Sequence, residues 1–362
     1  MKLGDLVEGI YLGTLSAALR ETDVPAVWDD SRRVTKGSLF VAMRGAVRKG
    51  DEFIEDALAR GAGIVMLDRT AEARFAGRRS RAAFLVVEDP VEAFRIIVDR
   101  FFGHPSSRVR VIGITGTNGK TTITYLLEAI IAAAGKKTGV VGTVNCRVGG
   151  KVIPTQNTTP GLLDNQSFLA QLIREKVGYA VMEVSSHALH QGRVENIDMA
   201  GGIFTNLTGD HLDYHKTMEG YFKAKSKLFR GLSPEAYAII NHDDEYGRRL
   251  FSLTRSRKVS YGLHKPVDVY ADIKEFGLKG MRFKIRYFGK VIELRTHLIG
   301  YHNIYNMLAA FSAGVAEGFE PEVVKQGIES VSHIPGRLER VDCGQEFCVF
   351  IDYAHTDDGL RN

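Results

Sequence analysis

Cysteine is scarce in this sequence, and its scarcity limits the classes of protein that fit. Only three cysteines occur among 362 residues, at positions 146, 343 and 348. Their number is odd, and no two of them stand in the C-x-x-C spacing that is typical of zinc and redox sites. We therefore expect reduced thiols in a cytoplasmic protein, and no disulfide framework.

Long apolar runs are also missing. No stretch reaches the ~20 apolar residues that a membrane-spanning helix needs. The first residues, MKLGDLVEGIYLGTL, do not show a basic segment followed by an apolar one. The sequence therefore predicts neither a secretory signal nor insertion into a membrane.

Charge of one sign is weak. The chain has 48 basic and 43 acidic residues, a net charge of +5. A basic cluster, RFAGRRSR (74–81), is not a basic stripe with interleaved aromatic residues of the kind that binds single-stranded nucleic acid, so we interpret it as a surface loop. We expect no nucleic-acid partner; the mild positive charge suits a small anionic substrate.

Turn residues in FFGHPSSRVR (101–110) mark a domain boundary. Before it, the apolar segments SLFVAM, AGIVML and AAFLVV predict short buried strands among helices. After it, predicted strands alternate with helices that begin at Lys120 and lie near 162–175 and 218–230. The predicted strands are RVRVIGIT, KTGVVGTV, GYAVMEV, GGIFTNL and YAIIN. This alternation predicts a parallel sheet with helices on both faces.

The pattern changes towards the C-terminus. The segment GMRFKIRYFGKVIELRTHLIG (280–300) alternates apolar and polar residues around a short turn, which predicts an antiparallel hairpin. A helix is predicted from His302 to about Glu317, and a second boundary lies near SHIPGRLERVD. One further strand, CVFIDYAHT, cannot close an α/β domain alone, so we expect a third domain that is only begun. The predicted domains are 1–106, 107–334 and 335–362.

The stretch GITGTNGKTTITYLLEAIIAAAG (113–135) has the layout of a phosphate-binding loop: a strand, a glycine-rich turn, Lys-Thr and a helix. Its backbone N–H groups and helix N-terminus favour a phosphate. Lys120 would neutralise the terminal phosphates, and Thr121 would face Mg²⁺. Ile114 stands where the strict motif requires glycine, so an ordinary glycine-rich turn remains the alternative.

Glu183 interrupts an apolar run in AVMEVSSHALHQGRV (180–194), at the end of a predicted strand. Ligands of open α/β sheets bind beyond such strand ends. A buried carboxylate needs a partner, and a metal ion or a salt bridge would each satisfy it. The sequence leaves these two interpretations open.

Acidic residues and histidines crowd the segment TNLTGDHLDYH (205–215), where Asp210, His211, Asp213 and His215 fall within six residues. The spacing matches no zinc motif, and Mg²⁺ prefers oxygen ligands. On spacing alone, a polar turn is the favoured interpretation.

Lys225 lies on the apolar stripe of the predicted helix MEGYFKAKSKLF, which Tyr221, Phe222, Leu228 and Phe229 form. Burial would lower its pKa, and a neutral amine can act as a nucleophile or react with carbon dioxide to form a carbamate. The alternative, which the residue alone favours, is a buried stem with its ammonium in water.

Two amides stand one turn apart at the start of the helix in GYHNIYNMLAAFSAG, at Asn303 and Asn306. Helix capping would explain Asn303. Two amides on one face could also recognise the edge of a base, and spacing does not separate these interpretations.

Several motifs, in this order, resemble the Mur ligase family of cell-wall synthesis over essentially the whole chain. They are DSRRVTKGSLFVAMRG, GTNGKTT, NTTPGL, MEVSSHAL, HLDYH, FKAKSKLF, HNIYNMLAA, PGRLERVD and DYAHTDDGL. The resemblance implies an α/β protein with a uridine-binding N-terminal domain and a central P-loop ATPase domain. The central domain would have a mostly parallel sheet plus a smaller antiparallel one, followed by the start of a Rossmann-like third domain.

The resemblance also implies a reaction. ATP would phosphorylate the D-glutamyl carboxylate of UDP-N-acetylmuramoyl-L-alanyl-D-glutamate, and the amine of meso-diaminopimelate or L-lysine would attack the acyl phosphate. Such chemistry needs positioning and charge neutralisation, for which ATP and Mg²⁺ are the implied cofactors. A folylpolyglutamate-synthetase-like ligase and a non-catalytic fragment that binds UDP-sugar or nucleotide are the alternatives.

Site residues follow from the resemblance, motif by motif. The ATP phosphates would be held by Gly116, Thr117, Asn118, Gly119, Lys120, Thr121 and Thr122. The nucleotide would also meet Asn303 and Asn306 near the base, Arg337 near the phosphates, and Asp352 and His355 from the third domain. Mg²⁺ would be held by Thr121 and Glu183, and a second Mg²⁺ by His211 and a carbamylated Lys225. The muramoyl-peptide would be held by Asn157, Thr158, Thr159, Ser185, Gln191 and Arg193, with Ser31 and Arg32 near the uridine.

This sequence departs from the family pattern in three places. It has Lys49-Gly50-Asp51 where members often read D-G-H, and His355-Thr356-Asp357-Asp358-Gly359 where they often read H-T-P-D-S. Members also carry a full third domain, which selects the amino acid. We therefore expect this chain to be a monomer that binds the muramoyl-dipeptide and ligates little or nothing.

Overall fold

The computed structural model describes residues 1–43, 50–75, 82–148, 151–153, 157–355 and 359–360. Three features predicted from the sequence lie wholly or partly outside these ranges: Lys49, most of the basic cluster 74–81, and positions 356–358. Within the described ranges, every helix is too short or too polar to cross a membrane.

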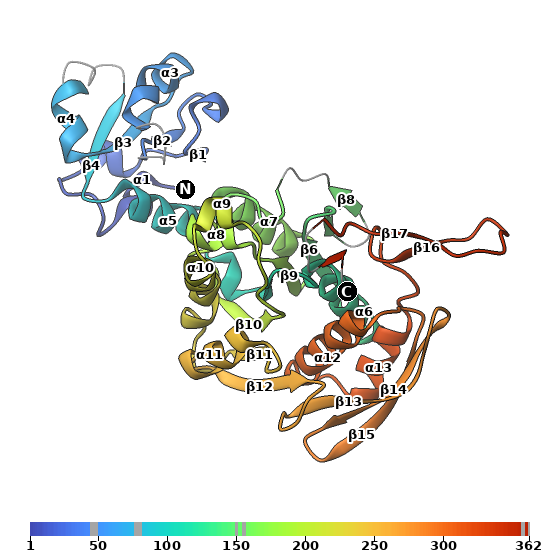
Figure 1. Cartoon of the computed structure of the whole chain (residues 1–362). Helices are drawn as coiled ribbons and strands as arrows, with labels where there is room; N and C mark the ends of the chain where they lie inside the picture. The colour runs from blue at the N-terminus through green and yellow to red at the C-terminus, as the bar shows by residue number, and fades with distance from the viewer. Residues whose placement is uncertain (44–49, 76–81, 149–150, 154–156, 356–358, 361–362) are drawn as a thin grey trace. The chain divides into compact units, whose positions relative to one another are not determined.

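The chain forms two compact units (Figure 1). Unit 1 comprises residues 1–105 and 162–170, and unit 2 comprises residues 106–161 and 171–362. Helix α7 (Leu162–Arg174) begins in unit 1 and ends in unit 2. Each unit has its own sheet, and the two are described separately.

Unit 1 is built on a parallel four-stranded sheet in the order β1-β2-β3-β4. The strands are β1 (Val27–Trp28), β2 (Leu39–Val41), β3 (Ile64–Asp68) and β4 (Ala83–Val87). The helices are α1 (Leu3–Val7), α2 (Ala17–Arg20), α3 (Ile54–Ala59), α4 (Arg69–Phe75) and α5 (Pro90–Phe101), with short 3-10 turns at η1 (Ser31–Arg33), η2 (Gly50–Phe53) and η4 (Pro105–Ser107). The three strands predicted from SLFVAM, AGIVML and AAFLVV are confirmed.

Alternate residues of these strands enter two separate apolar clusters. Leu39 and Val41 pack with α1 and α5 residues, whereas Phe40 packs with α3 and α4 residues. Helix α5 starts sharply because Asp89 accepts hydrogen bonds from the N–H groups of Val91 and Glu92, and proline occupies the next position.

Unit 2 contains an 11-stranded sheet in the order β15-β14-β13-β12-β11-β10-β5-β9-β6-β7-β8. The strands are β5 (Arg110–Thr115), β6 (Thr138–Val141), β7 (Cys146–Val148), β8 (Lys151–Ile153), β9 (Tyr179–Glu183), β10 (Met199–Phe204), β11 (Tyr237–Asn241), β12 (Arg257–Gly262), β13 (Val269–Gly277), β14 (Gly280–Tyr287) and β15 (Lys290–Thr296). The strands from β6 across to β13 pair in parallel, and β13, β14 and β15 pair antiparallel. The predicted parallel sheet and antiparallel hairpin are both confirmed.

The hairpin turns at Phe288 and Gly289, which both have positive φ and so match the twist of the strands. The antiparallel strands continue the parallel sheet through a short pairing of β12 with β13. The predicted 302–317 helix is confirmed as α12 (Tyr301–Ala316). The sequence prediction missed α11 (Glu245–Leu253), β12, β13 and α13 (Pro321–Glu329).

The other helices of unit 2 are α6 (Lys120–Ala133), α8 (Ser186–His190), α9 (Leu212–His215) and α10 (Met218–Arg230). Helices α6 and α12 supply much of the largest apolar cluster, which also takes side chains from β5, β9 and the antiparallel strands. Helix α13 lies against α6 (Figure 1) because position 327 is glycine: a Cβ there would be 2.4 Å from Ile130 Cα.

The segment after Arg337 forms a two-stranded antiparallel sheet of β16 (Glu339–Val341) and β17 (Val349–Ile351). The sequence predicted only the second of these strands. The backbone N–H of Tyr353 donates a 2.9 Å hydrogen bond to Gly336 O, so the chain beyond β17 returns to the residues just before β16.

Candidate active site

A polar pocket lies in unit 2 where β5, β9 and β10 end. Its volume is about 210 Å³, and its walls come from the 117–121 loop, the ends of the neighbouring strands and the 337–355 segment. A larger hollow, of about 510 Å³, lies between the loop after α8 and the end of α10. We place the chemistry in the smaller pocket because buried charged groups gather there.

Close approach of other chain segments fixes the shape of the loop before α6. A Cβ at Gly116 would lie 1.8 Å from Thr205 Oγ1, and a Cβ at Gly119 would lie 2.3 Å from Asn306 Oδ1. Both glycines also have positive φ, +150° and +88°. The predicted phosphate-binding loop thus has the glycines that its backbone requires.

Contacts from the loop after β10 hold the same turn. Asn118 N–H donates to Asn206 Oδ1 at 2.9 Å, and Thr205 Oγ1 donates to Asn118 O at 2.6 Å. The first-turn N–H groups of an α-helix have no intrahelical acceptors, and here Gly119, Lys120 and Thr121, at the start of α6, line the pocket. Thr122, which follows them, is buried in α6.

Lys120 turns back onto its own loop. Its Nζ donates to Gly116 O at 2.8 Å and to Thr117 O at 2.7 Å. Burial lowers the pKa of this ammonium, and the carboxylate of Glu183 acts in the opposite direction. An incoming anion at the loop would offer Lys120 stronger acceptors than two carbonyls.

Glu183 is only 1% exposed, and hydrogen bonds compensate its burial. Oε1 accepts from Thr121 Oγ1 and from Thr143 N, both at 3.0 Å, and Oε2 accepts from Thr143 Oγ1 at 2.9 Å. Among the residues that the structure describes, no basic side chain forms an ion pair with it. The salt-bridge interpretation is therefore wrong for the described part of the chain.

Lys225 is also 1% exposed, so the interpretation with its ammonium in water is wrong. Its Nζ donates to Gly116 O at 2.8 Å and lies 4.5 Å from the centre of the Tyr221 ring. Burial holds the pKa of this amine well below its ordinary value; nearby Lys120 lowers it further, and Asp210 opposes both. The amine is therefore a weak base inside the pocket.

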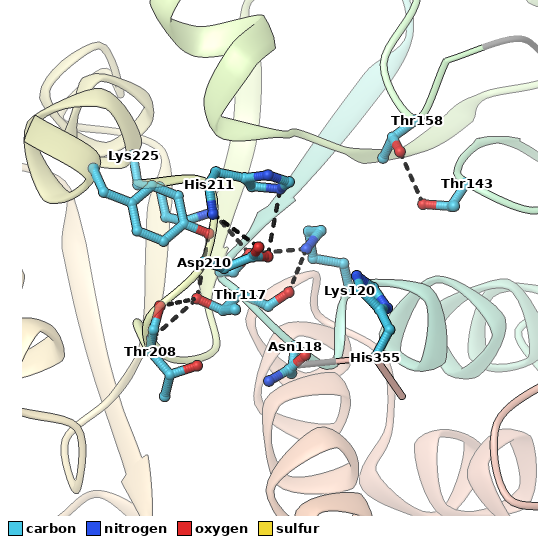
Figure 2. Close-up of polar contacts among 12 residues, drawn as sticks. Thr117, Asn118, Lys120, Thr143, Thr158, Thr208, Asp210, His211, Lys225 and His355 are labelled. Carbon is cyan, nitrogen blue, oxygen red and sulfur yellow. Dashed lines mark hydrogen bonds and ion pairs between the residues drawn. The ribbon is translucent and has the colours of Figure 1, made fainter. Parts of the chain in front are cut away.

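Figure 2 shows Lys120, Asp210, His211 and Lys225 turned towards one another beside the loop. Asp210 Oδ1 accepts from His211 N at 2.8 Å, and Oδ2 lies 3.4 Å from His211 Nε2. The segment is therefore a polar turn, as its spacing predicted, and it also lines the pocket. Burial lowers the pKa of His211, which favours the neutral imidazole that binds metals.

The donor set suits Mg²⁺. Oxygen atoms of Thr121, Glu183 and Asp210 line one pocket, and a Cβ at Gly142 would be 2.5 Å from Glu183 Oε1, so only glycine leaves that carboxylate its place. Among the described residues, no group of three or more His, Cys, Asp or Glu could hold a metal ion. Mg²⁺ usually takes few protein ligands and completes its shell with phosphates and water.

Four of the predicted peptide-binding residues form one hydrogen-bonded group. Thr159 Oγ1 donates to Glu183 O at 2.8 Å and accepts from Ser185 N at 3.0 Å. Arg193 donates to Thr159 O at 2.8 Å and to Gln191 Oε1 at 2.9 Å. These contacts connect the group directly to the end of β9, beside Glu183.

The other predicted substrate residues lie in different surroundings. Thr158 contacts Thr143 across 3.1 Å, and Asn157 is exposed. In unit 1, the exposed Arg32 pairs with Asp30, and Ser31 is buried in η1, where its hydroxyl hydrogen-bonds Asp56. The structure thus gathers the central residues of the predicted peptide site and leaves the predicted uridine residues in unit 1.

Asn303 does not cap its helix, so that interpretation is wrong. The residue preceding α12 is Gly300, with φ +94°, and Asn303 lies in the first turn. Its Nδ2 donates to Ile299 O at 2.7 Å, and its Oδ1 accepts from Asn306 Nδ2 at 3.1 Å. Both amides are buried, and Asn306 lies against the Gly119 turn.

The 337–355 segment reaches the pocket through some of its predicted residues. Arg337 donates to Thr121 Oγ1 at 3.3 Å, and His355 lines the pocket with Tyr353. Asp352 instead accepts from the N–H groups of Leu338 and Ala354, at 2.7 Å and 2.6 Å. It stabilises the turn that carries the others and is not part of the pocket wall.

Sequence reasoning missed five residues of the pocket wall: Thr143, Ser186, Asp210, Tyr221 and Tyr353. Asp210 was visible in the crowded acidic segment but carried no decisive spacing. Tyr221 was assigned to an apolar stripe, yet its hydroxyl lies 3.3 Å from Thr117 Oγ1. Thr143 gave no signal, because its partner Glu183 is 40 residues away.

Comparison with known proteins agrees with this geometry. Residues 114–314 match the Mur ligase middle domain, and residues 27–101 match the Mur ligase family catalytic domain. A UDP-N-acetylmuramoyl-L-alanyl-D-glutamate–2,6-diaminopimelate ligase of Solibacter usitatus (strain Ellin6076) is 43% identical over 365 residues, which cover 100% of this chain and 73% of the relative.

Solved structures give the same grouping. A structure with that same ligase name has a TM-score of 0.80 at 27% identity and covers 99% of this chain and 73% of its own. The folylpolyglutamate synthase of Mycobacterium tuberculosis, solved with ADP and AMPPCP, has a TM-score of 0.58 at 21% identity, over 72% of this chain and 67% of its own, which shows a shared fold alone. The chain belongs to the Mur ligase family.

Proposed function

We propose that this protein is an ATP-dependent ligase of peptidoglycan synthesis that adds 2,6-diaminopimelate to UDP-N-acetylmuramoyl-L-alanyl-D-glutamate. The observation that carries the proposal is 43% identity, over the whole chain, to a relative with that activity in its name. Diaminopimelate is preferred to L-lysine because the relatives aligned here share that name.

ATP binding is supported by the loop before α6 and by the ADP and AMPPCP complexes of the related fold. In the proposed first step, a D-glutamyl carboxylate oxygen attacks the γ-phosphorus, and the bond to the β-phosphate bridging oxygen breaks to release ADP. The amine of diaminopimelate then attacks the acyl carbon, phosphate leaves, and the nitrogen loses a proton.

The chain's own residues orient and neutralise the reacting groups. Lys120 exchanges its loop carbonyls for the terminal phosphates, and Arg337, already bonded to Thr121, adds a second positive charge. Thr121 and Glu183 would hold one Mg²⁺ and His211 would help hold a second, and when bound these ions would neutralise phosphate charge. Asn306, against the Gly119 turn, would keep the nucleotide close to the loop.

Lys225 has the properties that carbamate formation requires. Its amine is buried and has a strongly lowered pKa, so a neutral nitrogen is available to attack carbon dioxide. The new N–C bond forms with loss of one proton from nitrogen, which leaves an anionic carbamate. We propose this carbamate as a further oxygen ligand beside His211.

The muramoyl-peptide would be held by the Thr159, Ser185, Gln191 and Arg193 group, with Asn157 and Thr158 before it in the chain. We place the uridine at Ser31 and Arg32 of unit 1. The free thiols of the described structure suit the cytoplasm, and we propose a monomer there.

A folylpolyglutamate-synthetase-like activity is the alternative, because that enzyme shares the fold. Calorimetric titration with UDP-N-acetylmuramoyl-L-alanyl-D-glutamate, and in parallel with a reduced folate, separates the two. We expect binding of the UDP-sugar peptide and none of folate; the reverse result would overturn the proposal.

A further inference from the structure

Thr143 hydrogen-bonds both oxygens of the Glu183 carboxylate. It follows β6 and Gly142 in the chain, and it donates from its backbone N–H to Oε1 at 3.0 Å and from its hydroxyl to Oε2 at 2.9 Å. Thr121 supplies the third hydrogen bond, to Oε1 at 3.0 Å. With both oxygens held, the plane of the carboxylate cannot turn without breaking a bond to Thr143.

Counting the hydroxyl protons shows which atom donates in each hydrogen bond of this group. A threonine hydroxyl has one proton, and Thr143 gives its proton to Glu183. In the 3.1 Å contact between the hydroxyls of Thr143 and Thr158, the donor must therefore be Thr158. With its proton used, Thr158 can act towards a ligand only as an acceptor, which suits an amide N–H of a peptide substrate.

The same count applies on the other side of Glu183. Thr121 gives its proton to Oε1, so it accepts the 3.3 Å hydrogen bond from Arg337. A continuous series results, from Thr158 through Thr143 to Glu183 and from Arg337 through Thr121 to the same carboxylate. Every hydrogen bond in this series is donated in the direction of Glu183, so each depends on the negative charge of the Glu183 carboxylate.

We propose that Thr143 is a positioning residue that holds Glu183 in its metal-binding orientation and connects it to the substrate loop at Thr158. The proposal rests on the proposed function, in which Glu183 faces Mg²⁺ and Thr158 faces the peptide. Among the described residues, Thr143 is the one side chain that hydrogen-bonds both Thr158 and Glu183. In this proposal Thr143 acts on the reaction through Glu183 and not by contact with a reacting atom.

Calorimetric titration with AMPPCP, with and without Mg²⁺, tests the proposal on the Thr143→Val variant. We expect Mg²⁺-supported affinity to fall about tenfold, the lower end for loss of a group that orients a metal ligand, while Mg²⁺-free affinity stays within about twofold. Thr143→Ser, which keeps the hydroxyl, should restore most of the loss. In a Glu183→Gln background, Thr143→Val should cause no further loss, because its effect passes through that carboxylate.

Thr138→Val is the matched control. Thr138 lies on β6, the strand that precedes Thr143, is 7% exposed, and has a hydroxyl with no hydrogen-bond partner among the described residues. Thr138→Val makes the same side-chain change at a buried position that does not contact Glu183, and it should leave both affinities unchanged. Thermal unfolding shows whether Thr143→Val folds; if it does not, Thr143→Ala takes its place.

Three results would overturn the positioning role: an equal loss with and without Mg²⁺, no rescue by serine, or full additivity with Glu183→Gln. Failure of the proposed function looks different, because the unaltered protein would then bind neither AMPPCP nor the UDP-muramoyl-dipeptide. The wild-type titrations therefore come first and separate the two claims.

Discussion

Charged side chains are buried at the site edge of the unit 2 sheet, which is the end that lines the pocket. They are exposed on the antiparallel extension, which consists of strands β13, β14 and β15. At the pocket, Glu183 at the end of β9 and Lys225 on α10 are each 1% exposed. Along β13, β14 and β15, charged side chains pair at the surface, as Arg286 does with Asp272 at 2.5 Å. Burying an ion is costly, whereas an exposed pair contributes little. The free-energy cost of burying ionisable groups at the site edge indicates that these groups serve binding. The antiparallel extension, which avoids this cost, serves the fold.

The largest effect that this comparison predicts is on nucleotide binding. Lys120→Ala removes the ammonium that lies over the loop and should weaken AMPPCP binding about 100-fold, which corresponds to the ~3 kcal/mol of a strong charged hydrogen bond. Lys290→Ala, at an exposed position of β15, is the control and should leave affinity unchanged. Calorimetric titration measures both variants. Equal AMPPCP affinities for Lys120→Ala and Lys290→Ala would mean that the site edge is no more important for nucleotide binding than the antiparallel extension.

Lys225→Met should separate stability from function. Methionine has similar length and leaves no amine to bury, so we expect the free energy of unfolding to rise by roughly 1 kcal/mol. The same variant should lose Mg²⁺-supported AMPPCP affinity, because it removes a proposed ligand. Urea unfolding and titration measure the two effects.

Lys223→Met is the matched control for that substitution, since Lys223 is exposed on the same helix. Its free energy of unfolding should change by less than about 0.5 kcal/mol. If the free energy of unfolding rose in Lys223→Met and fell in Lys225→Met, the claim that burial of the Lys225 amine is costly would be contradicted.

Acid should destabilise the site edge through His215. Burial, with His187, His190 and Lys225 nearby, lowers the pKa of His215 to about 4. Between the unfolded value near 6.5 and that folded value, the unfolded chain binds the extra proton. Stability contributed by keeping His215 neutral is therefore present above about pH 6.5 and is lost as the pH falls towards 4.

His215→Phe should flatten this dependence, whereas His264→Phe, at an exposed position before the extension, should not. Urea unfolding at about pH 7 and about pH 5 measures the difference in the free energy of unfolding. One proton limits the slope to about 1.4 kcal/mol per pH unit, and partial exposure of His215 makes it smaller. An unchanged slope in His215→Phe would assign acid sensitivity to other groups.

The smallest effect belongs to the extension. Arg286→Gln breaks the surface pair with Asp272, and the free energy of unfolding should fall by less than about 1 kcal/mol. A fall of several kcal/mol in urea unfolding would mean that the surface pairs carry as much energy as the buried groups, contrary to the comparison.

The predictable part of this molecule consists of local patterns. The glycine-rich turn and the helix from Lys120 follow from adjacent residues, and so do the hairpin at Phe288-Gly289 and the short buried strands. Strands β12 and β13 were missed because their exposed halves weaken any regular period in burial. Helix α13 did carry a usable signal, a proline in its first turn before an apolar stripe.

Only those parts of the candidate site could be predicted for which the neighbouring sequence indicates whether a residue is buried or exposed. The stripe on α10 indicated that Lys225 faces inward, but the choice between a buried and a solvated amine depends on Gly116, 109 residues away. Thr143 and Asp210 take part through contacts that no spacing reveals. Capping was one of two open interpretations of Asn303, and it was wrong because the helix starts two residues earlier, at Tyr301, after the positive φ of Gly300.

The central claim is that the pocket transfers a phosphoryl group from ATP to the carboxylate of the UDP-muramoyl-dipeptide. Incubation with ATP, Mg²⁺, that substrate and hydroxylamine tests it, because hydroxylamine converts an acyl phosphate into a hydroxamate that mass spectrometry detects. We predict ATP-dependent formation of the UDP-muramoyl-dipeptide hydroxamate together with ADP, and its loss in Lys120→Ala. Absence of hydroxamate from a protein that binds both AMPPCP and the UDP-muramoyl-dipeptide would contradict the account.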